Sequence, residues 1–200
     1  MIRLVVADDE ELIRSAIIAL LEMEADIRVV GDVGDGTTAV TLTQQLRPDV
    51  VLLDLEMPGA DGIEAAGIIH RSTNARTIIV TRHARPGVLR RALAAGVSGF
   101  IPKSSPVSKV ADVVREVAAG RRCIDAEIAA VALTAADCPM TDRELEVLRL
   151  TRRHDRVSEI AGELFLAEGT VRNYLSAAMA KLDARTRQEA ARTAWDRGWI

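Results

Sequence analysis

Strand-like and helix-like segments alternate along residues 1–120, and this alternation constrains the fold more than any other feature. Val50–Leu53 is wholly apolar, as expected of a strand buried on both faces of a parallel sheet. In residues 10–22 apolar side chains recur at three- and four-residue steps, which is typical of one helix face. The same pattern along the chain predicts strands at 3–8, 27–33, 50–53, 77–81 and 98–101 and helices at 10–22, 37–46, 62–71, 86–95 and 107–119. These five strand–helix units predict an α/β fold, a doubly wound five-stranded parallel sheet.

The alternation stops at Gly120, and a second type of organisation follows. Residues 121–138 read as a linker, and from Met140 onward only helical periodicity is present. The predicted helices are 142–152, 156–165, 168–182 and 186–197. We therefore expect two domains, a sheet domain at 1–120 and a small all-α four-helix domain at 139–200, joined by the linker 121–138.

Composition narrows the class of protein without identifying a function. The longest unbroken apolar runs, of which Ala16–Leu21 is one, are far too short to cross a bilayer, and Met1 leads directly into a strand without a secretion leader. We therefore expect a cytoplasmic protein. Cys123 and Cys138 lie outside any CxxC pair, so two reduced thiols are favoured over a metal or redox site. The net charge is −3, and residues 140–200 hold eleven Lys or Arg against ten Asp or Glu. Charge alone therefore predicts only weak non-specific affinity for DNA.

Acidic and phosphate-binding side chains stand where the predicted strands end. Asp8 and Asp9 close the first strand and Asp54 closes the third. Thr81 ends the fourth strand and Lys103 follows the fifth. Such ends converge on one edge of a doubly wound sheet. Clustered carboxylates need a compensating charge, which Mg²⁺ supplies, while a lysine and a hydroxyl suit phosphoryl oxygens. Turns also favour Asp and Thr, so any one of these residues alone could be a turn residue.

These residues carry a resemblance to a known family. Ala7–Asp9, Leu53–Gly59, Val80–Thr81 and Pro102–Lys103 resemble the signature of CheY-like receiver domains, over the first 120 residues. The resemblance implies that Asp54 accepts a phosphoryl group from a histidine kinase. It also implies that Asp9, Asp54 and the backbone carbonyl of Glu56 bind Mg²⁺ or another divalent cation, with Asp8 assisting through water. Thr81 and Lys103 would contact the phosphoryl oxygens, and Phe100 would be the switch aromatic.

The longest helix of the second domain has two unlike faces. Val171, Leu175, Ala178 and Leu182 form one apolar stripe, whereas Arg172, Asn173, Ser176 and Lys181 stand outside it. Arg and Asn can bond purine edges in the major groove, and a tight break at 165–168 separates this helix from a shorter one, as in a helix-turn-helix. An amphipathic helix of an ordinary bundle would show the same two faces.

A second resemblance supports the helix-turn-helix. Met140–Leu148, Glu159–Ala161, Glu168–Asn173 and Lys181–Leu182 look like the LuxR-type DNA-binding domain, and together with the receiver they indicate a response regulator of the NarL/FixJ class. Glu56–Gly59, Ala84–Gly87, Ala94–Val97 and Arg197–Trp199 resemble its DesR-like branch, in which the kinase senses the membrane. The resemblance implies that Arg172, Asn173 and Ser176 face bases, and that Thr170 and Lys181 touch phosphates.

The second domain departs from the LuxR-type pattern in three places. His154 replaces a helix-ending glycine, so we expect an unfavourable turn there. Arg156 and Val157 replace the usual Ser-Asn opening of the first motif helix, so Asp155 is the expected N-cap of that helix. Ala167 replaces the serine cap of the reading helix, a loss worth about 0.5–2 kcal/mol.

The whole pattern predicts a DNA-binding transcription regulator that phosphorylation of Asp54 activates through dimerisation. Its partners would be a membrane-bound sensor histidine kinase, promoter double-stranded DNA and a second copy of the chain, with RNA polymerase as a further candidate. One alternative is a phosphorylation-independent regulator whose receiver is only a dimerisation scaffold. Another is an aspartate-dependent phosphatase, but those enzymes carry a second Asp where this chain has Glu56. We therefore expect no enzyme beyond self-catalysed phosphoryl transfer and autodephosphorylation at Asp54.

Overall fold

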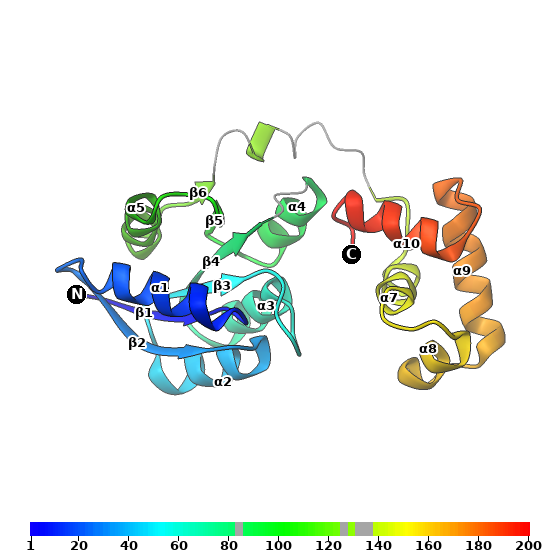
Figure 1. Ribbon diagram of the computed structural model, residues 1–200, viewed down its shortest axis with the longest axis horizontal. Helices are drawn as coiled ribbons and strands as arrows, with labels where there is room; N and C mark the ends of the chain where they lie inside the picture. The colour runs from blue at the N-terminus through cyan, green and yellow to red at the C-terminus, as the bar shows by residue number, and fades with distance from the viewer. Residues whose placement is uncertain (83–85, 125–127, 131–137) are drawn as a thin grey trace. The chain divides into compact units, whose positions relative to one another are not determined.

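The computed structural model describes residues 1–82, 86–124, 128–130 and 138–200 (Figure 1). The chain divides into two compact units, one built around a parallel sheet and one around four helices. The predicted linker 121–138 lies partly outside the described residues, as do residues 84 and 85 of the DesR-like motif, and its bounds stay a prediction. Among the described residues, no helix combines the length and the apolar composition that crossing a membrane requires.

The first unit is a parallel sheet of the predicted doubly wound type. Its strands lie in the order β2-β1-β3-β4-β5-β6. The strands are β1 Ile2–Ala7, β2 Ile27–Val33, β3 Val50–Asp54, β4 Arg76–Thr81, β5 Gly99–Pro102 and β6 Cys123–Ile124. All neighbouring pairs are parallel. The first five strands agree with the predicted ranges to within one residue at each end.

The sixth strand was not predicted. β6 lies inside the range that we assigned to the linker and pairs with β5 through Gly99↔Cys123 and Phe100↔Ile124. The Cys123 N–H also donates to the Ser98 carbonyl at 2.9 Å. Two residues are too few to show a period-two pattern. The free edge of β5 nevertheless offers backbone hydrogen-bond partners to the segment that follows the helix at 107–118.

Five helices flank this sheet at the predicted places. They are α1 Glu11–Leu21, α2 Gly36–Leu46, α3 Gly62–Ser72, α4 Pro86–Ala94 and α5 Val107–Ala118. α1 and α5 pack on one face, where Leu21 and Val114 join the strand residues Leu4 and Ile78 in one core. α2 and α3 pack against each other and the sheet. Asp61 begins α3 in a capping box with Glu64, so local chemistry fixes the start of the helix that follows Asp54.

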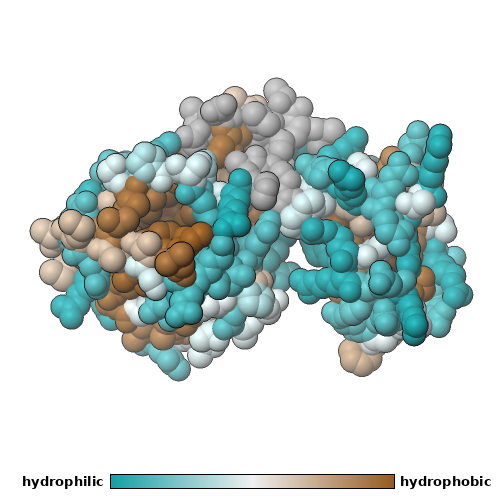
Figure 2. Space-filling view, in the orientation of Figure 1, coloured by the Kyte–Doolittle hydropathy of each residue, from teal (hydrophilic) through white to brown (hydrophobic). Residues whose placement is uncertain are grey.

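The visible surfaces of the two units differ in character (Figure 2). Hydrophobic residues gather on the first unit in the region of α1, where Leu12 is 84% exposed. The visible face of the second unit is mostly hydrophilic.

The second unit contains the four predicted helices around one core. They are α7 Asp142–Thr151, α8 Val157–Leu164, α9 Glu168–Leu182 and α10 Arg187–Asp196. Leu148, Ile160, Val171 and Ala194 are buried in this core. Because α8 and α9 are separated by a short turn and share the core, they form the helix pair that the sequence predicts.

Two predicted details of the α7–α8 connection are wrong. Among the described residues, positive φ outside glycine occurs only at Arg47, Phe165 and Asp183, so His154 adopts no left-handed turn. Its N–H instead donates to the Leu150 carbonyl at 2.9 Å. The N-cap of α8 is Arg156, not Asp155, and the Glu159 side chain accepts from the Arg156 N–H at 3.1 Å. The helix starts one residue later than we expected, so the Asp155 carboxylate is out of register for the cap.

Candidate functional site

The strand-end residues meet at one edge of the sheet. Asp54 is the last residue of β3 and Thr81 the last of β4, and both are buried. Asp8 directly follows β1 and Lys103 directly follows β5. Because parallel strands end on the same side, four separate turns place these side chains together.

Lys103 connects the two buried carboxylates. Its Nζ lies 2.9 Å from the Asp8 Oδ2 and 3.0 Å from the Asp54 Oδ2. Lys103 is held in place from the backbone side as well, since its N–H donates to the Thr81 carbonyl at 2.7 Å. Pro102, the last residue of β5, pairs with Thr81 without disturbing this bond.

Two residues at this edge were missed by the sequence interpretation. Glu10 accepts from the Lys103 ammonium at 3.0 Å and also forms an ion pair with Arg82. The signal for Glu10 was its place directly after the acid pair. Arg82 directly follows Thr81, and no pattern in the sequence distinguished it. A pocket of about 170 Å³ opens here, lined by Asp9, Glu10, Asp54, Glu56, Thr81, Arg82 and Lys103.

Burial and charge set the proton affinities of the site. Burial raises the pKa of Asp54 to about 6, although the hydrogen bond and the charge of Lys103 pull it down. For Lys103 burial acts to lower the pKa, but bonds to Asp8, Glu10 and Asp54 outweigh it, so its pKa is raised. The Lys103 hydrogen bond lowers the pKa of Glu10. At neutral pH the Asp54 carboxylate is therefore ionised and Lys103 is protonated.

The carboxylates fit a divalent cation. One oxygen each from Asp8, Asp9, Glu10 and Asp54 can be chosen so that all lie within 4.8 Å of one another. Hard oxygen donors in such a cluster suit Mg²⁺, which keeps several waters and takes only a few protein ligands. Of the predicted ligands, Asp8, Asp9 and Asp54 are in this cluster, and Glu56 lines the pocket beside it. Receiver domains as a family bind Mg²⁺ in such an acidic pocket.

Phe100 is almost wholly buried in this structure. It lies on β5, pairs with Ile79 of β4, and is 1% exposed. The ring therefore lies inside the first unit, and its role as the switch aromatic stays a prediction.

The reading face of α9 is present on the second unit. Val171, Leu175 and Ala178 are buried, whereas Arg172, Asn173 and Ser176 are exposed. Thr170 is half-buried, and Arg172 forms an ion pair with Glu168 one turn earlier. Ala167 is the N-cap of α9, as predicted, and makes no side-chain cap bond.

Lys181 is engaged inside the second unit. Its Nζ donates to both carboxylate oxygens of Glu144, at 2.6 and 2.9 Å. Glu144 is 5% exposed. Lys181 thus neutralises a buried acid, and a phosphate would have to share its ammonium with Glu144.

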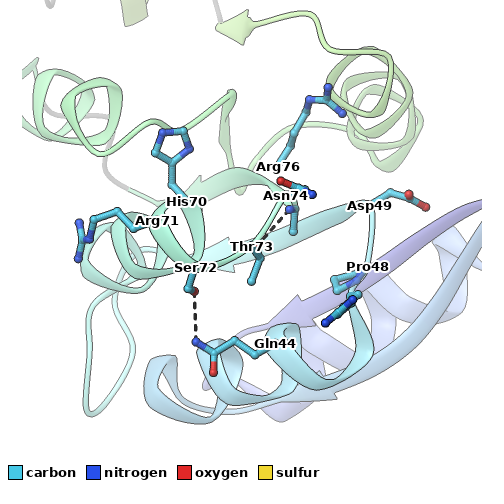
Figure 3. Close-up of a pocket in the computed structure, with 11 residues that line it drawn as sticks. Gln44, Pro48, Asp49, His70, Arg71, Ser72, Thr73, Asn74 and Arg76 are labelled. Atoms are coloured by element: carbon cyan, nitrogen blue, oxygen red, sulfur yellow. Dashed lines mark hydrogen bonds between the residues drawn. The ribbon is translucent and has the colours of Figure 1, made fainter.

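A larger pocket than that of the acidic edge lies at the opposite edge of the sheet (Figure 3). It has a volume of about 1030 Å³ between the ends of α2 and α3 and the start of β4. The labelled His70, Arg71 and Arg76 point in different directions, and Arg76 donates to the Ala118 carbonyl at 3.2 Å. Since its basic groups do not converge, this pocket lacks the organised chemistry of the acidic edge.

Comparison with known proteins agrees with this geometry. Residues 4–115 match the response regulator receiver domain, and residues 139–194 match the bacterial regulatory proteins of the LuxR family. The chain belongs to the response regulators that join a receiver to a LuxR-type DNA-binding domain, the NarL/FixJ class of two-component transcription regulators.

Individual relatives match along the whole chain. Transcriptional regulatory protein DesR of Bacillus subtilis is 40% identical over 200 residues, covering 100% of both chains. Response regulator RamR of Streptomyces coelicolor is 35% identical, covering 100% of this chain and 98% of that protein. Both relatives are regulators by name.

Solved structures show the same architecture. The response regulator ChrA of a heme-sensing two-component system has a TM-score of 0.59 at 28% identity, covering 100% of this chain and 98% of ChrA. The receiver domain of the NarL regulator of Mycobacterium tuberculosis has a TM-score of 0.59 at 34% identity, covering 60% of this chain and 98% of that domain.

Proposed function

We propose that Asp54 accepts a phosphoryl group from a sensor histidine kinase and that this event switches the protein to its DNA-binding dimer. The observation that carries the proposal is the Lys103 ammonium, which lies 3.0 Å from the Asp54 carboxylate at the end of β3. A buried acid beside a fixed cation, in a pocket that opens to the outside, is what an acceptor needs.

The chemistry follows from the side chains at the acidic edge. An oxygen of the ionised Asp54 attacks the phosphorus, the phosphorus–nitrogen bond of the donor histidine breaks, and the nitrogen takes a proton. Lys103 and the Thr81 hydroxyl receive the phosphoryl oxygens. A divalent cation held by Asp8, Asp9, Asp54 and the Glu56 carbonyl would neutralise charge that develops on these oxygens. The same groups would let the protein accept a phosphoryl group from a small donor such as acetyl phosphate. They would also assist hydrolysis of the acyl phosphate formed on Asp54.

The output depends on α9 and on pairing of two chains. Arg172, Asn173 and Ser176 would meet base edges in the major groove, while Thr170 would touch the backbone. Lys181 would reach a phosphate only by sharing its ammonium with Glu144. Residues 140–200 carry almost no net charge, so one copy would hold DNA weakly and two copies on one palindromic site would hold it much better.

In this proposal the protein acts in the cytoplasm and binds promoter DNA. The kinase of our proposal is membrane-bound, and RNA polymerase is a candidate partner once the dimer is on DNA. The domain bounds that we propose are a receiver at 1–120, a linker at 121–138 and the DNA-binding domain at 139–200.

The first experiment tests the acceptor. Purified chain is incubated with acetyl phosphate and Mg²⁺, and intact mass and phosphate-affinity gel mobility are measured. We expect one added phosphoryl group on the wild type and none on Asp54→Ala. Phosphorylation that survives this substitution would place the acceptor elsewhere.

The second experiment separates the proposal from the scaffold alternative. DNA is selected from a random pool with the phosphorylated chain, and affinity for the selected duplex is measured with and without acetyl phosphate. We expect tighter binding and dimer formation only for phosphorylated wild type. Equal affinity for wild type and Asp54→Ala under both conditions would favour a receiver that serves as a passive scaffold.

A further inference from the structure

Phe165 has an unusual position in the second unit. It follows the last residue of α8 and is 95% exposed. Its backbone is left-handed, with φ 55° and ψ 42°. For an L-residue with a bulky side chain this conformation is unfavourable, and an exposed ring adds no burial.

The turn itself does not need this ring. The Phe165 N–H donates to the Gly162 carbonyl at 3.3 Å, and the Leu166 N–H donates to the Ala161 carbonyl at 2.9 Å. Backbone groups therefore close α8, and Leu166 supplies the apolar contact with the core. Glycine would adopt a positive φ without strain, as Gly96 and Gly120 do after α4 and α5.

The surroundings of Phe165 are bare. A β-carbon at Gly162 or at Gly169 would meet no heavy atom within 4 Å. Both glycines are exposed, although glycine is a poor helix former in an open position. The turn between α8 and α9 is thus an outward surface with one projecting ring, and a partner can approach its backbone closely.

This surface is continuous with the proposed reading face. Phe165 lies three residues before Glu168, where α9 begins, and Arg172 and Asn173 follow one turn into that helix. In a docked helix-turn-helix the first helix crosses the DNA backbone and the start of the second enters the major groove. The turn that joins them then lies at the strand that borders the groove, where sugars offer apolar surface.

We propose that Phe165 is a DNA-contacting residue that packs its ring on a deoxyribose of the strand bordering the major groove. This inference rests on the proposed DNA-binding function of α9. The contact reads no base, so it positions α9 on every sequence alike. Burial of the ring against the sugar then removes its apolar surface from water. This gain offsets the cost of the left-handed backbone at Phe165.

The test uses the full chain, phosphorylated with acetyl phosphate and Mg²⁺, and two labelled duplexes, one of random sequence and one selected with the phosphorylated wild type. We expect Phe165→Gly to weaken binding to both duplexes by the same factor, about five- to tenfold for a half-buried ring. The slope of log affinity against log salt should not change, because no charge is removed. Phe165→Leu should retain most of the affinity and Phe165→Asn should lose as much as the glycine variant.

Stability supplies the readout that separates binding from folding. Phe165→Gly should melt at a higher temperature than the wild type while it binds DNA less well, because glycine relieves the left-handed strain. Met23→Ala is the matched control, since Met23 is 79% exposed on the first unit, and it should leave DNA affinity unchanged.

Each outcome decides between the two proposals. If the wild type binds neither duplex, the DNA-binding function fails. If the wild type binds and Phe165→Gly binds equally well, only the role of Phe165 is refuted, and a protein partner becomes the better occupant. A loss restricted to the selected duplex would overturn the sugar contact in favour of a base contact.

Discussion

The Lys103 ammonium and the Asp54 carboxylate lie 3.0 Å apart, and their side chains are 8% and 6% exposed. Two opposite charges that are both withdrawn from water depend on each other more than a surface pair does. Burial alone would push the Asp54 proton affinity up, and Lys103 is the main group that opposes this effect. Lys103, which directly follows β5, therefore controls the protonation of the acceptor Asp54.

Replacing Lys103 should raise the pKa of Asp54. In Lys103→Met the opposing hydrogen bond and charge are removed, so the pKa should rise above its present value of about 6. Titration of the carbon-13-labelled Asp54 carboxyl by NMR, in magnesium-free buffer, measures this directly. Arg82→Gln is the control, because Arg82 pairs with Glu10 and not with Asp54. An Asp54 pKa that is the same in Lys103→Met and wild type would contradict this account.

Neutralising Asp54 should stabilise the metal-free receiver at neutral pH. The folded pKa of about 6 exceeds the ordinary value of 3.8, so the folded state binds more protons between these values and stability falls as pH rises through them. Asp54→Asn removes this loss and should increase the free energy of unfolding at pH 7 by up to about 2 kcal/mol. The gain should shrink as pH falls below about 6 and should be absent below about pH 4. Urea unfolding at several pH values tests the prediction, which a pH-independent difference would refute.

Magnesium should stabilise the first unit through the acidic cluster. Oxygens of Asp8, Asp9, Glu10 and Asp54 gather within 4.8 Å, and a bound cation would relieve their repulsion. The melting temperature should rise with Mg²⁺ concentration, as binding to the folded state alone requires. Asp9→Asn should shift this response to higher Mg²⁺ concentrations. Glu11→Gln, which changes an acid outside the cluster, is the matched control, and an equal loss of response in both variants would rule out the site.

The sequence predicted the acidic edge well because topology determines it. Once Val50–Leu53 is recognised as a buried strand in a parallel sheet, Asp54 must lie at the shared edge, whatever the loops do. The Glu10–Arg82 pair was missed because it depends on two loop conformations that no periodic pattern encodes. β6 was missed because two residues carry no period.

In the second unit, sequence rules predicted a helix cap correctly where it depends on one side chain alone. They failed where the cap depends on the residue at which the helix starts. The absence of a cap at Ala167 follows from its side chain alone, and the structure confirms it. The cap of α8 depends on where the helix starts, and a shift of one residue moved it from Asp155 to Arg156. The partner of Lys181 is Glu144, from another helix, and sequence spacing gave no sign of it.

A serine at position 167 should stabilise the second unit. Ala167 has the extended backbone of an N-cap, with φ −70° and ψ 144°, but offers no oxygen to the first N–H groups of α9. Ala167→Ser should add about 0.5–2 kcal/mol to the free energy of unfolding. Thermal unfolding followed by circular dichroism measures the gain. Ala167→Val, which lacks the hydroxyl, should give none, and an equal effect of both substitutions would contradict the capping explanation.

Lys181 should contribute to the stability of the second unit, because it is the cation beside the buried Glu144. Burial acts to raise the pKa of Glu144, but bonds from Lys181 and Thr141 outweigh it, so its pKa is lowered. Lys181→Met leaves this carboxylate without its cation and should cost about 1–3 kcal/mol of stability at pH 7. Since the folded pKa of Glu144 is depressed, its contribution is present at neutral pH and is lost as pH falls through that pKa.

A double-mutant cycle isolates the interaction between Lys181 and Glu144. Glu144→Gln keeps the shape and the bond to the Thr141 N–H while it removes the charge. Lys181→Met should therefore cost much less stability in the Glu144→Gln background than in the wild type.

DNA affinity, measured in the same variants, separates the two roles of the lysine. If Lys181 serves the fold alone, Lys181→Met in the Glu144→Gln background binds DNA as tightly as Glu144→Gln itself. If it also reaches a phosphate, the affinity falls in both backgrounds and the salt dependence becomes shallower by about one counterion. A cost of Lys181→Met that is equal in both backgrounds would show that the ion pair contributes nothing to stability.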